Sequence, residues 1–210
     1  MKQLRLSEEK RNYISKHRKT PFIELFTKTP KEIICPHFWQ LHWAFGCYYA
    51  CTYCYLIGTS WGRTCHEPPV VYSNEDKLFG ELEVWLKDPQ PKMLNTGEVT
   101  DSLAITDRLA KKLIVRFAEQ DTHKLLLLTK SDNVDGILRL EHNGQTIVSF
   151  SINPPTVAEK FELKAPHPEL RLKAAWKCKQ AGYPIRVRLD PMIPVAGWRE
   201  AYLDLAEEIN

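Results

Sequence analysis

Cys47, Cys51 and Cys54 are the residues of this sequence whose type and spacing most plainly predict chemistry. They follow a C-x₃-C-x₂-C pattern, directly after the apolar and aromatic run 41–45. Cysteines this close in one short loop cannot pair as disulfides without straining the geometry of the bond, and any pair leaves the third cysteine over. Three thiolates can instead wrap around one corner of a metal centre. Iron–sulfur clusters are held by cysteine thiolates, and three such ligands leave one iron of a four-iron cube open to another molecule.

Zinc is an alternative that the residues alone leave open. A structural zinc site normally takes a fourth Cys or His at short range. Cys65 and His66 follow the three cysteines and could supply that ligand. Thiols without any metal, packed in the core or lying at the surface, are a third interpretation.

Composition limits the class of protein. The chain has 210 residues, of which 43% are hydrophobic and 26% charged, the ordinary range of globular proteins. It contains no apolar run of about eighteen residues, so we expect no membrane span. The first residues lack the apolar core of a secretory signal. Because the six cysteines have no secretory context, we expect reduced thiols in a cytoplasmic protein, and we take it as a monomer.

The N-terminal part of the chain is basic. Residues 1–32 hold nine Lys and Arg against four Asp and Glu. The stretch 10–19 could contact the phosphates of a nucleic acid, although a solvated leader would have the same composition. We therefore predict a basic N-terminal leader, 1–34, and one domain, 35–210.

Strand-like and helix-like segments alternate through the predicted domain, as in a parallel sheet with crossover helices. The third strand is apolar throughout, as expected of a strand buried on both faces. Five β–α units are fewer than a closed barrel contains, so we predict an α/β fold, a partial (β/α) TIM-type barrel of parallel strands that is truncated at the C-terminus. The predicted strands are 41–45, 93–95, 125–128, 146–152 and 184–189. The predicted helices are 74–86, capped by Asn74, 106–117, 132–140, capped by Ser131, 168–181, and one from residue 198.

Polar side chains gather where these strands end. In barrels of this kind the functional groups lie on loops at the carboxyl ends of the strands. The segments at those places are 96–101, 129–131, 151–153 and 190–192. Each has a structural alternative, since Gly97 could serve a tight turn, Glu98 and Asp101 could cap a helix, and Lys130 could be a solvated charge. Together they would place donors and acceptors on the same rim as the cysteines.

The ordered set of motifs resembles the radical S-adenosylmethionine superfamily, and within it the spore photoproduct lyase family. The cysteine spacing is the superfamily's signature, and Gly97-Glu98 resembles its Gly-Glu motif. The similarity runs from about residue 35 to residue 210. Further motifs that resemble the family are Cys51-Thr52-Tyr53-Cys54-Tyr55-Leu56, Thr129-Lys130, Val134-Asp135, His142-Asn143-Gly144 and Phe150-Ser151-Ile152-Asn153.

The resemblance implies a mechanism and its cofactors. Cys47, Cys51 and Cys54 would bind a 4Fe–4S cluster whose open iron chelates S-adenosyl-L-methionine. An electron from the cluster then gives a 5′-deoxyadenosyl radical, which abstracts hydrogen from the substrate. The cofactor-binding residues would be Tyr53, Gly97, Glu98, Thr100, Asp101, Lys130, Ser151 and Asn153.

Individual roles also follow from the resemblance. Glu98 would accept from the amino group of the cofactor, and Lys130 and Ser151 would help to hold its amino acid end. Asn153 would contact the ribose or the amino acid portion. Tyr53 would lie against the adenine, and Tyr55 is a candidate catalytic relay. The family also implies a reducing electron donor of the flavodoxin or ferredoxin type.

The substrate implied by the family is a DNA lesion, and two features count against it. Spore photoproduct lyases carry a hydrogen-donating cysteine on the loop after strand two, and counting back from Thr100-Asp101 places Glu98 there. The chain also stops before the family's DNA-holding hairpin. Cys65 and Cys178 are the other candidate donors, although Cys178 is expected to be packed on a helix. From a different class, the alternative is a non-catalytic zinc- or cluster-binding module with a nucleic-acid partner.

Overall fold

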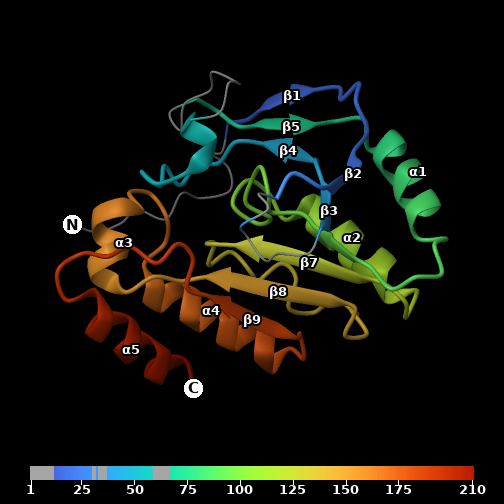
Figure 1. Ribbon diagram of the computed structural model, residues 1–210. Coiled ribbons are helices and arrows are strands. Elements are labelled where there is room, and N and C mark those ends of the chain that lie inside the picture. Colours follow the sequence, from blue (N-terminus) through green and yellow to red (C-terminus); the bar gives the residue numbers. More distant parts are fainter. Residues whose placement is uncertain (1–11, 30–31, 33–36, 59–66) are drawn as a thin grey trace.

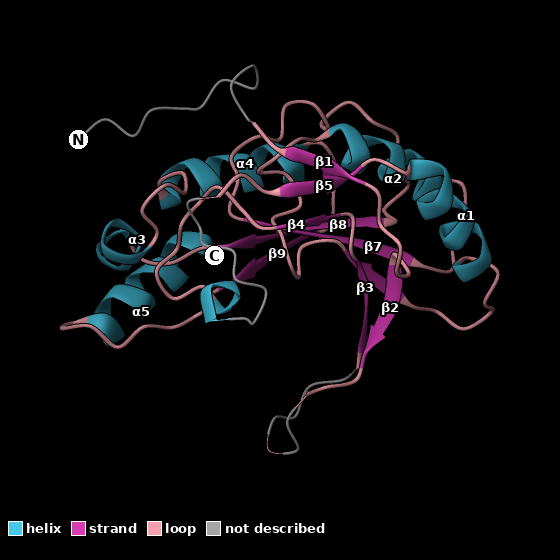
Figure 2. Cartoon of the chain, turned by 90° about the horizontal axis from the view of Figure 1, so that it is seen from above, coloured by secondary structure: helices cyan, strands magenta, loops and turns pink. Residues whose placement is uncertain are grey.

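A curved, six-stranded sheet forms the centre of the molecule. The structure, a computed structural model, describes residues 12–29, 32, 37–58 and 67–210. The strand order is β2–β3–β6–β7–β8–β9, with β2 antiparallel to β3 and every later neighbour parallel. The sheet bends without closing on itself (Figure 2), which confirms the predicted partial barrel. The strands are β2 Ile23–Phe26, β3 Phe38–Leu41, β6 Met93–Asn95, β7 Lys124–Thr129, β8 Thr146–Ser151 and β9 Ile185–Arg188.

Helices α1, α2 and α4 lie on the convex face of the sheet, while α3 and α5 lie toward one end (Figures 1 and 2). Helix α2 turns a stripe of Leu109, Leu113 and Phe117 into the core, at the helical spacing that the sequence predicts. The covered sheet and right-handed crossovers bring the carboxyl ends of β6, β7, β8 and β9 to the same edge. The helices are α1 Glu75–Trp85, α2 Arg108–Ala118, α3 Pro155–Phe161, α4 Pro168–Gln180 and α5 Trp198–Ile209. Among the described residues, none of them is both long and apolar enough to cross a membrane.

A second, smaller sheet carries the cysteine loop. It consists of β1 Ile14–Lys16, β5 Val70–Tyr72 and β4 Ala44–Phe45, in the order β1–β5–β4. The prediction of one strand over 41–45 is therefore wrong, because Leu41 ends a strand of the large sheet and Ala44 begins one of the small sheet. Between them Trp43 is buried, and its Nε1 donates to the carbonyl of Thr96 at 2.9 Å. This hydrogen bond fixes the position at which the chain leaves the large sheet and enters the small one.

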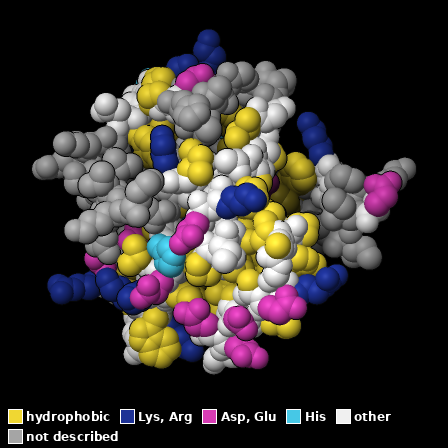
Figure 3. Space-filling view, turned by 90° about the vertical axis from the view of Figure 1, so that its left-hand side faces the viewer, with side chains coloured by type: hydrophobic (Ala, Val, Ile, Leu, Met, Phe, Trp, Pro, Cys, Tyr) yellow, Lys and Arg dark blue, Asp and Glu magenta, His cyan; other side chains and the backbone are white. Residues whose placement is uncertain are grey.

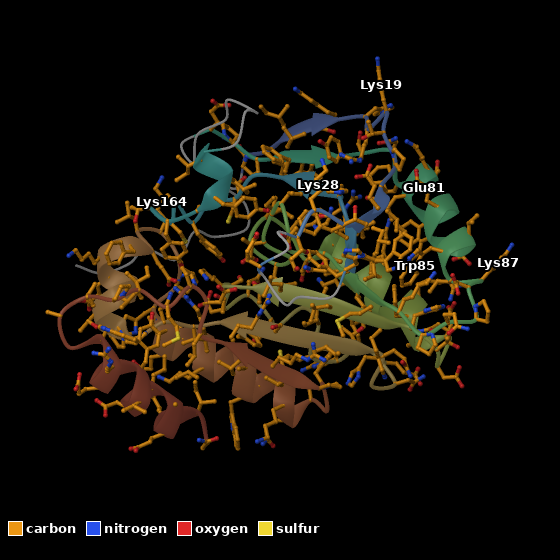
Figure 4. All side chains as sticks on the ribbon, viewed as in Figure 1. Lys19, Lys28, Glu81, Trp85, Lys87 and Lys164 are labelled. Atoms are coloured by element: carbon orange, nitrogen blue, oxygen red, sulfur yellow. The ribbon has the colours of Figure 1, made fainter. Side chains whose placement is uncertain are left out.

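The described part of the predicted leader packs against the domain. Strands β1 and β2 both lie within 1–34, and Phe22 is completely buried. The Glu81 carboxylate on α1, labelled in Figure 4, accepts from the backbone N–H groups of Phe22 at 2.6 Å and Ile23 at 3.2 Å. Lys10 and Arg11 of the basic stretch lie outside the described residues.

Two local predictions were wrong. Residues 132–140 form turns instead of a helix, and Ser131 accepts from the N–H of Asn133 at 3.0 Å, a local bond that competes with helix formation. Helix α3, which was not predicted, begins at Pro155, because proline fits the first helical position. The side chain of Asn74 binds the N–H and carbonyl of Arg18 and does not cap α1.

Strand β7 also differs from its prediction. Its residues alternate between buried and half-buried, so it has one core face and one face toward the open concavity of the barrel. The remaining helices and strands agree with the predicted ones to within a few residues. The turn at 142–144 is confirmed, with Asn143 at φ +46° and Gly144 at φ +68°, and Gly182 ends α4 at φ +89°.

Candidate active site

The cysteine loop begins directly after β4. Gly46 has φ +90°, a left-handed conformation that favours glycine, and it directs the chain away from the strand. The N–H of Cys54 donates to the carbonyl of Cys51 at 3.0 Å, which closes a turn between these two ligand candidates. All three cysteines of the motif are free thiols, with Cys51 buried and the other two half-buried.

Hydrogen bonds anchor this loop on two sides. Toward β6, the N–H of Gly46 donates to the carbonyl of Val99 at 3.0 Å, and Thr100 Oγ1 donates to the carbonyl of Gly46 at 2.8 Å. Toward α3, the backbone of Cys51 forms an antiparallel bridge with that of Glu162. The thiols are therefore fixed relative to the barrel edge, although they belong to a different sheet.

A cavity of about 320 Å³ opens between the cysteine loop and the carboxyl ends of the strands. Its volume suits a small-molecule cofactor. Eleven of the twelve predicted site residues line it, and Asn153 does not. Those eleven are Cys47, Cys51, Tyr53, Cys54, Tyr55, Gly97, Glu98, Thr100, Asp101, Lys130 and Ser151, and the wall also includes Tyr49, Leu56, Leu128, Thr129, Asp190 and Pro191.

Lys130 and Ser151 form one polar group at the wall of the cavity. Lys130 Nζ donates to Ser151 Oγ and, at 3.4 Å, to the carbonyl of Asp190. Ser151 Oγ donates to the same carbonyl at 2.8 Å. The ammonium is thus held at the ends of three parallel strands, with its lysine side chain 14% exposed. It is placed to bind an anionic group that enters the cavity.

Asp101 organises the backbone around that lysine. One carboxylate oxygen accepts from Leu103 N at 2.9 Å, Ala104 N at 2.9 Å and Thr129 Oγ1 at 2.7 Å. The other accepts from the backbone N–H of Lys130 at 2.7 Å. Four donors occupy this carboxylate, so it joins the loop after β6 to the end of β7.

Gly97 and Glu98 belong to the loop after β6 and line the same cavity. A Cβ at Gly97 would lie 2.6 Å from Leu128 Cβ and carbonyl oxygen, so glycine lets the loop approach β7. Glu98 is half-buried, and burial raises the pKa of its carboxyl, while the charge of Arg188 opposes that shift. Asn95 Nδ2 donates to its Oε2 at 3.4 Å. Glu98 therefore lines, with an acidic group, the cavity that the ammonium of Lys130 also lines.

The two predicted tyrosines have different surroundings. Tyr53 OH donates to Glu162 Oε1, and the Tyr53 ring centroid lies 5.7 Å from Lys130 Nζ. Burial, with the Cys51 sulfur and the Glu162 carboxylate nearby, raises the pKa of Tyr53. Tyr55 is 56% exposed and its OH donates to the carbonyl of Glu98 at 2.7 Å.

Asn153 is placed behind the cavity wall. It is completely buried, its Nδ2 donates to Glu162 Oε1 at 3.0 Å, and its Oδ1 accepts from Tyr202 OH at 2.7 Å. Cys178 is buried in α4 within the core, as expected. Cys65 and His66 lie outside the described residues.

Sequence reasoning missed Glu162 and Arg171, which are both 0% exposed. Their ion pair, Arg171 Nη2 to Glu162 Oε2, measures 2.5 Å. Burial opposes the ionisation of Glu162, but Arg171 and Lys130 outweigh it and lower the pKa of the carboxyl. Arg171 lies on the buried stripe of α4 with Ala174, Ala175 and Cys178. The position of Arg171 on this otherwise apolar stripe could have revealed the pair. Charged residues are rarely fully buried unless they are paired, so a buried arginine predicts an acidic partner.

The thiols fit a metal cluster. Burial raises the pKa of Cys47 well above its ordinary value and that of Cys51 to about 11, so without a cation both stay protonated. A bound metal deprotonates its thiol ligands. In the part of the chain that the structure describes, no three His, Cys, Asp or Glu side chains are grouped around the position of a single ion. A cube takes each thiolate at a separate iron, and three thiolates leave its fourth iron open to another ligand.

The edge that carries these residues faces the viewer in Figure 3. Hydrophobic side chains gather in the middle of this face, with basic and acidic side chains around them. Acidic side chains collect toward the bottom of the view, the side on which α5 lies in Figure 1. The visible surface therefore offers apolar contact at its centre and charge at its margin.

Comparison with known proteins gives consistent matches. A family model described as spore photoproduct lyase matches residues 28–210. The spore photoproduct lyase of Bacillus subtilis (strain 168) is 30% identical over 178 residues, which cover 82% of this chain and 51% of that protein. The one of Geobacillus sp. (strain Y412MC61) is 31% identical over 170 residues, 79% of this chain and 49% of that protein. The chain spans about half the length of the curated relatives it matches.

Two solved structures extend the similarity to the fold. A spore photoproduct lyase complexed with dinucleoside spore photoproduct superposes with a TM-score of 0.79 at 28% identity, covering 94% of this chain and 56% of that one. A mutant spore photoproduct lyase with bound AdoMet and dinucleoside spore photoproduct gives a TM-score of 0.71 at 32% identity, covering 79% and 49%.

Proposed function

Because the chain belongs to the spore photoproduct lyase family, we propose that it is a radical S-adenosylmethionine enzyme that acts on a spore photoproduct lesion in DNA. The observation that carries the proposal is the shared cavity. Three free thiols from one loop, an ammonium from β7 and a carboxyl group from the loop after β6 all line it. The same cavity could therefore hold both a metal cluster, at the thiols, and a zwitterionic ligand, at the two charged groups.

Cys47, Cys51 and Cys54 would hold a 4Fe–4S cluster, with S-adenosylmethionine beside it. When bound, the two cofactors supply a 5′-deoxyadenosyl radical that abstracts hydrogen from the substrate. Lys130 and Glu98, of opposite charge and lining one cavity, match the carboxylate and the ammonium of the cofactor's amino acid end. Ser151 sits beside Lys130 and completes this group.

The remaining predicted residues have supporting roles in the proposal. The aromatic face of Tyr53 would pack against the adenine, as its amphipathic ring allows. Gly97, Thr100 and Asp101 would shape the loop that carries Glu98. Asn153 would act on the ribose or amino acid portion through the buried group that it forms with Glu162. Tyr55 remains our candidate relay between the cavity and the substrate.

The comparisons correct our expectation against a DNA lesion as the substrate. That expectation rested on Glu98 at the position counted as the family's cysteine and on the end of the chain. Both solved relatives described above contain dinucleoside spore photoproduct, which supports a thymine lesion as the substrate class here. A flavodoxin- or ferredoxin-type electron donor, a cytoplasmic location and a monomeric state remain predictions.

Anaerobic reconstitution with iron and sulfide tests the cofactor part. We expect about four irons per chain, a brown absorbance band, and 5′-deoxyadenosine when the loaded protein is reduced with S-adenosylmethionine present. A variant with Cys47, Cys51 and Cys54 all replaced by Ala serves as the control and should stay colourless. Parent protein that remains colourless and binds zinc tightly would refute the proposal.

A separate assay tests the substrate. The reconstituted chain is incubated with an oligonucleotide carrying the spore photoproduct, and restored thymines are measured by mass spectrometry. We expect repair that requires both reductant and S-adenosylmethionine. If 5′-deoxyadenosine forms while the lesion stays intact, the radical chemistry holds and the substrate assignment is wrong.

A further inference from the structure

A fully buried ion pair lies directly behind the cofactor cavity. Glu162, at the end of α3, and Arg171, on α4, are both 0% exposed and are joined at 2.5 Å. Neither belongs to a motif that the sequence singled out. The contacts of the two side chains connect the pair to residues of the cavity.

One oxygen of Glu162 collects three residues that we assign to the cofactor. Its Oε1 accepts from Tyr53 OH and from Asn153 Nδ2 at 3.0 Å, and it lies 3.7 Å from Lys130 Nζ. These groups come from the cysteine loop, the end of β8 and the end of β7. Glu162 also bridges the backbone of Cys51. Glu162 therefore contacts both the cysteine loop and the ends of strands β7 and β8.

Arg171 fixes the other side of Glu162. Its Nε donates to the carbonyl of Pro166 at 2.7 Å, and its Nη1 donates to the carbonyl of Ser151 at 3.1 Å. Its third nitrogen, Nη2, faces Glu162. The guanidinium thus links the position of Glu162, through the ion pair, to the backbone of Ser151.

Stability alone does not account for such a pair. Removing two charges from water costs several kcal/mol for each ion, and apolar replacements of similar volume are often neutral or stabilising. Removing one partner, by contrast, leaves an uncompensated buried charge and costs about 3–5 kcal/mol. A costly pair whose carboxylate contacts two cavity-lining residues, Lys130 and Tyr53, is better explained by what it positions.

We propose that Glu162 is a positioning residue for S-adenosylmethionine, which holds Lys130 and Tyr53 in binding geometry and is itself fixed by Arg171. This inference rests on the proposed function for its ligand. The carboxylate keeps the Lys130 ammonium at the cavity wall and orients the Tyr53 ring through its hydroxyl. Without Glu162, both side chains would lose a partner on the side away from the cofactor.

Replacing both members of the ion pair at once distinguishes an effect on cofactor binding from a loss of folding stability. The variant Glu162→Met/Arg171→Leu removes both charges and keeps the core apolar, so we expect a folded protein with the parent's iron content. We expect its affinity for S-adenosylmethionine, measured by equilibrium dialysis on reconstituted protein, to fall at least tenfold. The matched control, Glu169→Met/Lys173→Leu, removes an exposed pair of α4 and should bind as the parent does. Parent-like affinity in the buried-pair variant would overturn the proposal.

A second measurement needs no cofactor. Lys130 in metal-free protein is acetylated with N-hydroxysuccinimide acetate and quantified by peptide mass spectrometry, with exposed Lys160 as the internal reference. We expect several-fold faster modification of Lys130 in the variant, and an unchanged rate would contradict the role of Glu162. If Met and Leu prevent folding, Glu162→Gln/Arg171→Gln gives the same test with a hydrogen-bonding neutral pair. Parent protein that takes up no iron would refute the proposed function, whereas the Lys130 rates would still decide on Glu162.

Discussion

Thr100 holds the first residue of the cysteine loop, because its Oγ1 donates to the carbonyl oxygen of Gly46 at 2.8 Å. The bond connects the loop after β6 to the turn that precedes Cys47. It spans two sheets that share no strand. The distance between the cysteine loop and the strand ends of the large sheet therefore depends on a small number of such hydrogen bonds.

The variant Thr100→Val keeps the shape of this side chain and removes the hydroxyl donor. We expect the free energy of unfolding to fall by about 0.5–1.5 kcal/mol, because the half-buried Gly46 carbonyl loses its hydrogen-bond partner. Chemical denaturation measures this loss, and iron release to a chelator should become faster. Thr100→Ser keeps the donor and should behave as the parent. Equal stability of the Val variant and the parent would contradict the role of the bond.

Gly97→Ala and Gly80→Ala should change stability in opposite directions. A Cβ at Gly97 would meet Leu128 at 2.6 Å, so we expect a loss of about 1–3 kcal/mol from overpacking. At Gly80, an exposed position inside α1, nothing lies within 4 Å of a Cβ, and alanine should stabilise by about 0.5–1 kcal/mol. Thermal melts of both variants check the pair. A stabilising Gly97→Ala would show that the loop does not pack against β7 as described.

Lys130→Ala should weaken S-adenosylmethionine binding without loss of iron. The substitution removes a charge-assisted hydrogen bond to the cofactor carboxylate, worth about 1.5–3 kcal/mol, or roughly 10- to 100-fold in affinity. Equilibrium dialysis and iron analysis on the same samples give both values. Lys160→Ala on α3 is the matched control. Iron loss in Lys130→Ala would mean that the lysine supports the cluster loop instead.

Glu98 should make cofactor binding depend on pH. Burial raises the pKa of its carboxyl above the ordinary value of 4.5, so the group is increasingly protonated in weakly acidic solution. Only the ionised form attracts the ammonium of the cofactor, and affinity should therefore rise as the pH rises through this pKa. We expect this rise, in dialysis measurements, at a higher pH than an ordinary carboxyl group would give. Glu98→Gln should bind more weakly at neutral pH and show a flat profile, whereas exposed Glu159→Gln should keep the parent's slope.

Local patterns predicted the parts of the fold that depend on neighbouring residues. The apolar run of β7, the stripe of α2 and the glycine that ends α4 all act within a few residues, and each was placed correctly along the chain. The same is true of the three cysteines, since they belong to one short loop and all line the cavity. The error at 132–140 has the opposite cause. Val134 and Ile137 are buried, but turns fixed by the surrounding structure bury them without a helix.

The missing part of the site depends on contacts that no spacing reveals. Tyr53 and Glu162 lie 109 positions apart in the sequence and meet only through the fold. The division of 41–45 between two sheets likewise depends on Trp43 reaching the carbonyl of Thr96. Sequence reasoning found the groups that would touch a cofactor. It could not find the buried residues that hold those groups in place.

Strand β9 has one hydrogen-bonded neighbour among the described strands, and it ends the order of the large sheet. Its exposed positions are both arginines, Arg186 and Arg188. A second copy of the chain that approached this edge would bring like charges together, which disfavours strand-to-strand association. High salt would screen that repulsion. Purification at low ionic strength is therefore the condition under which this edge best resists aggregation.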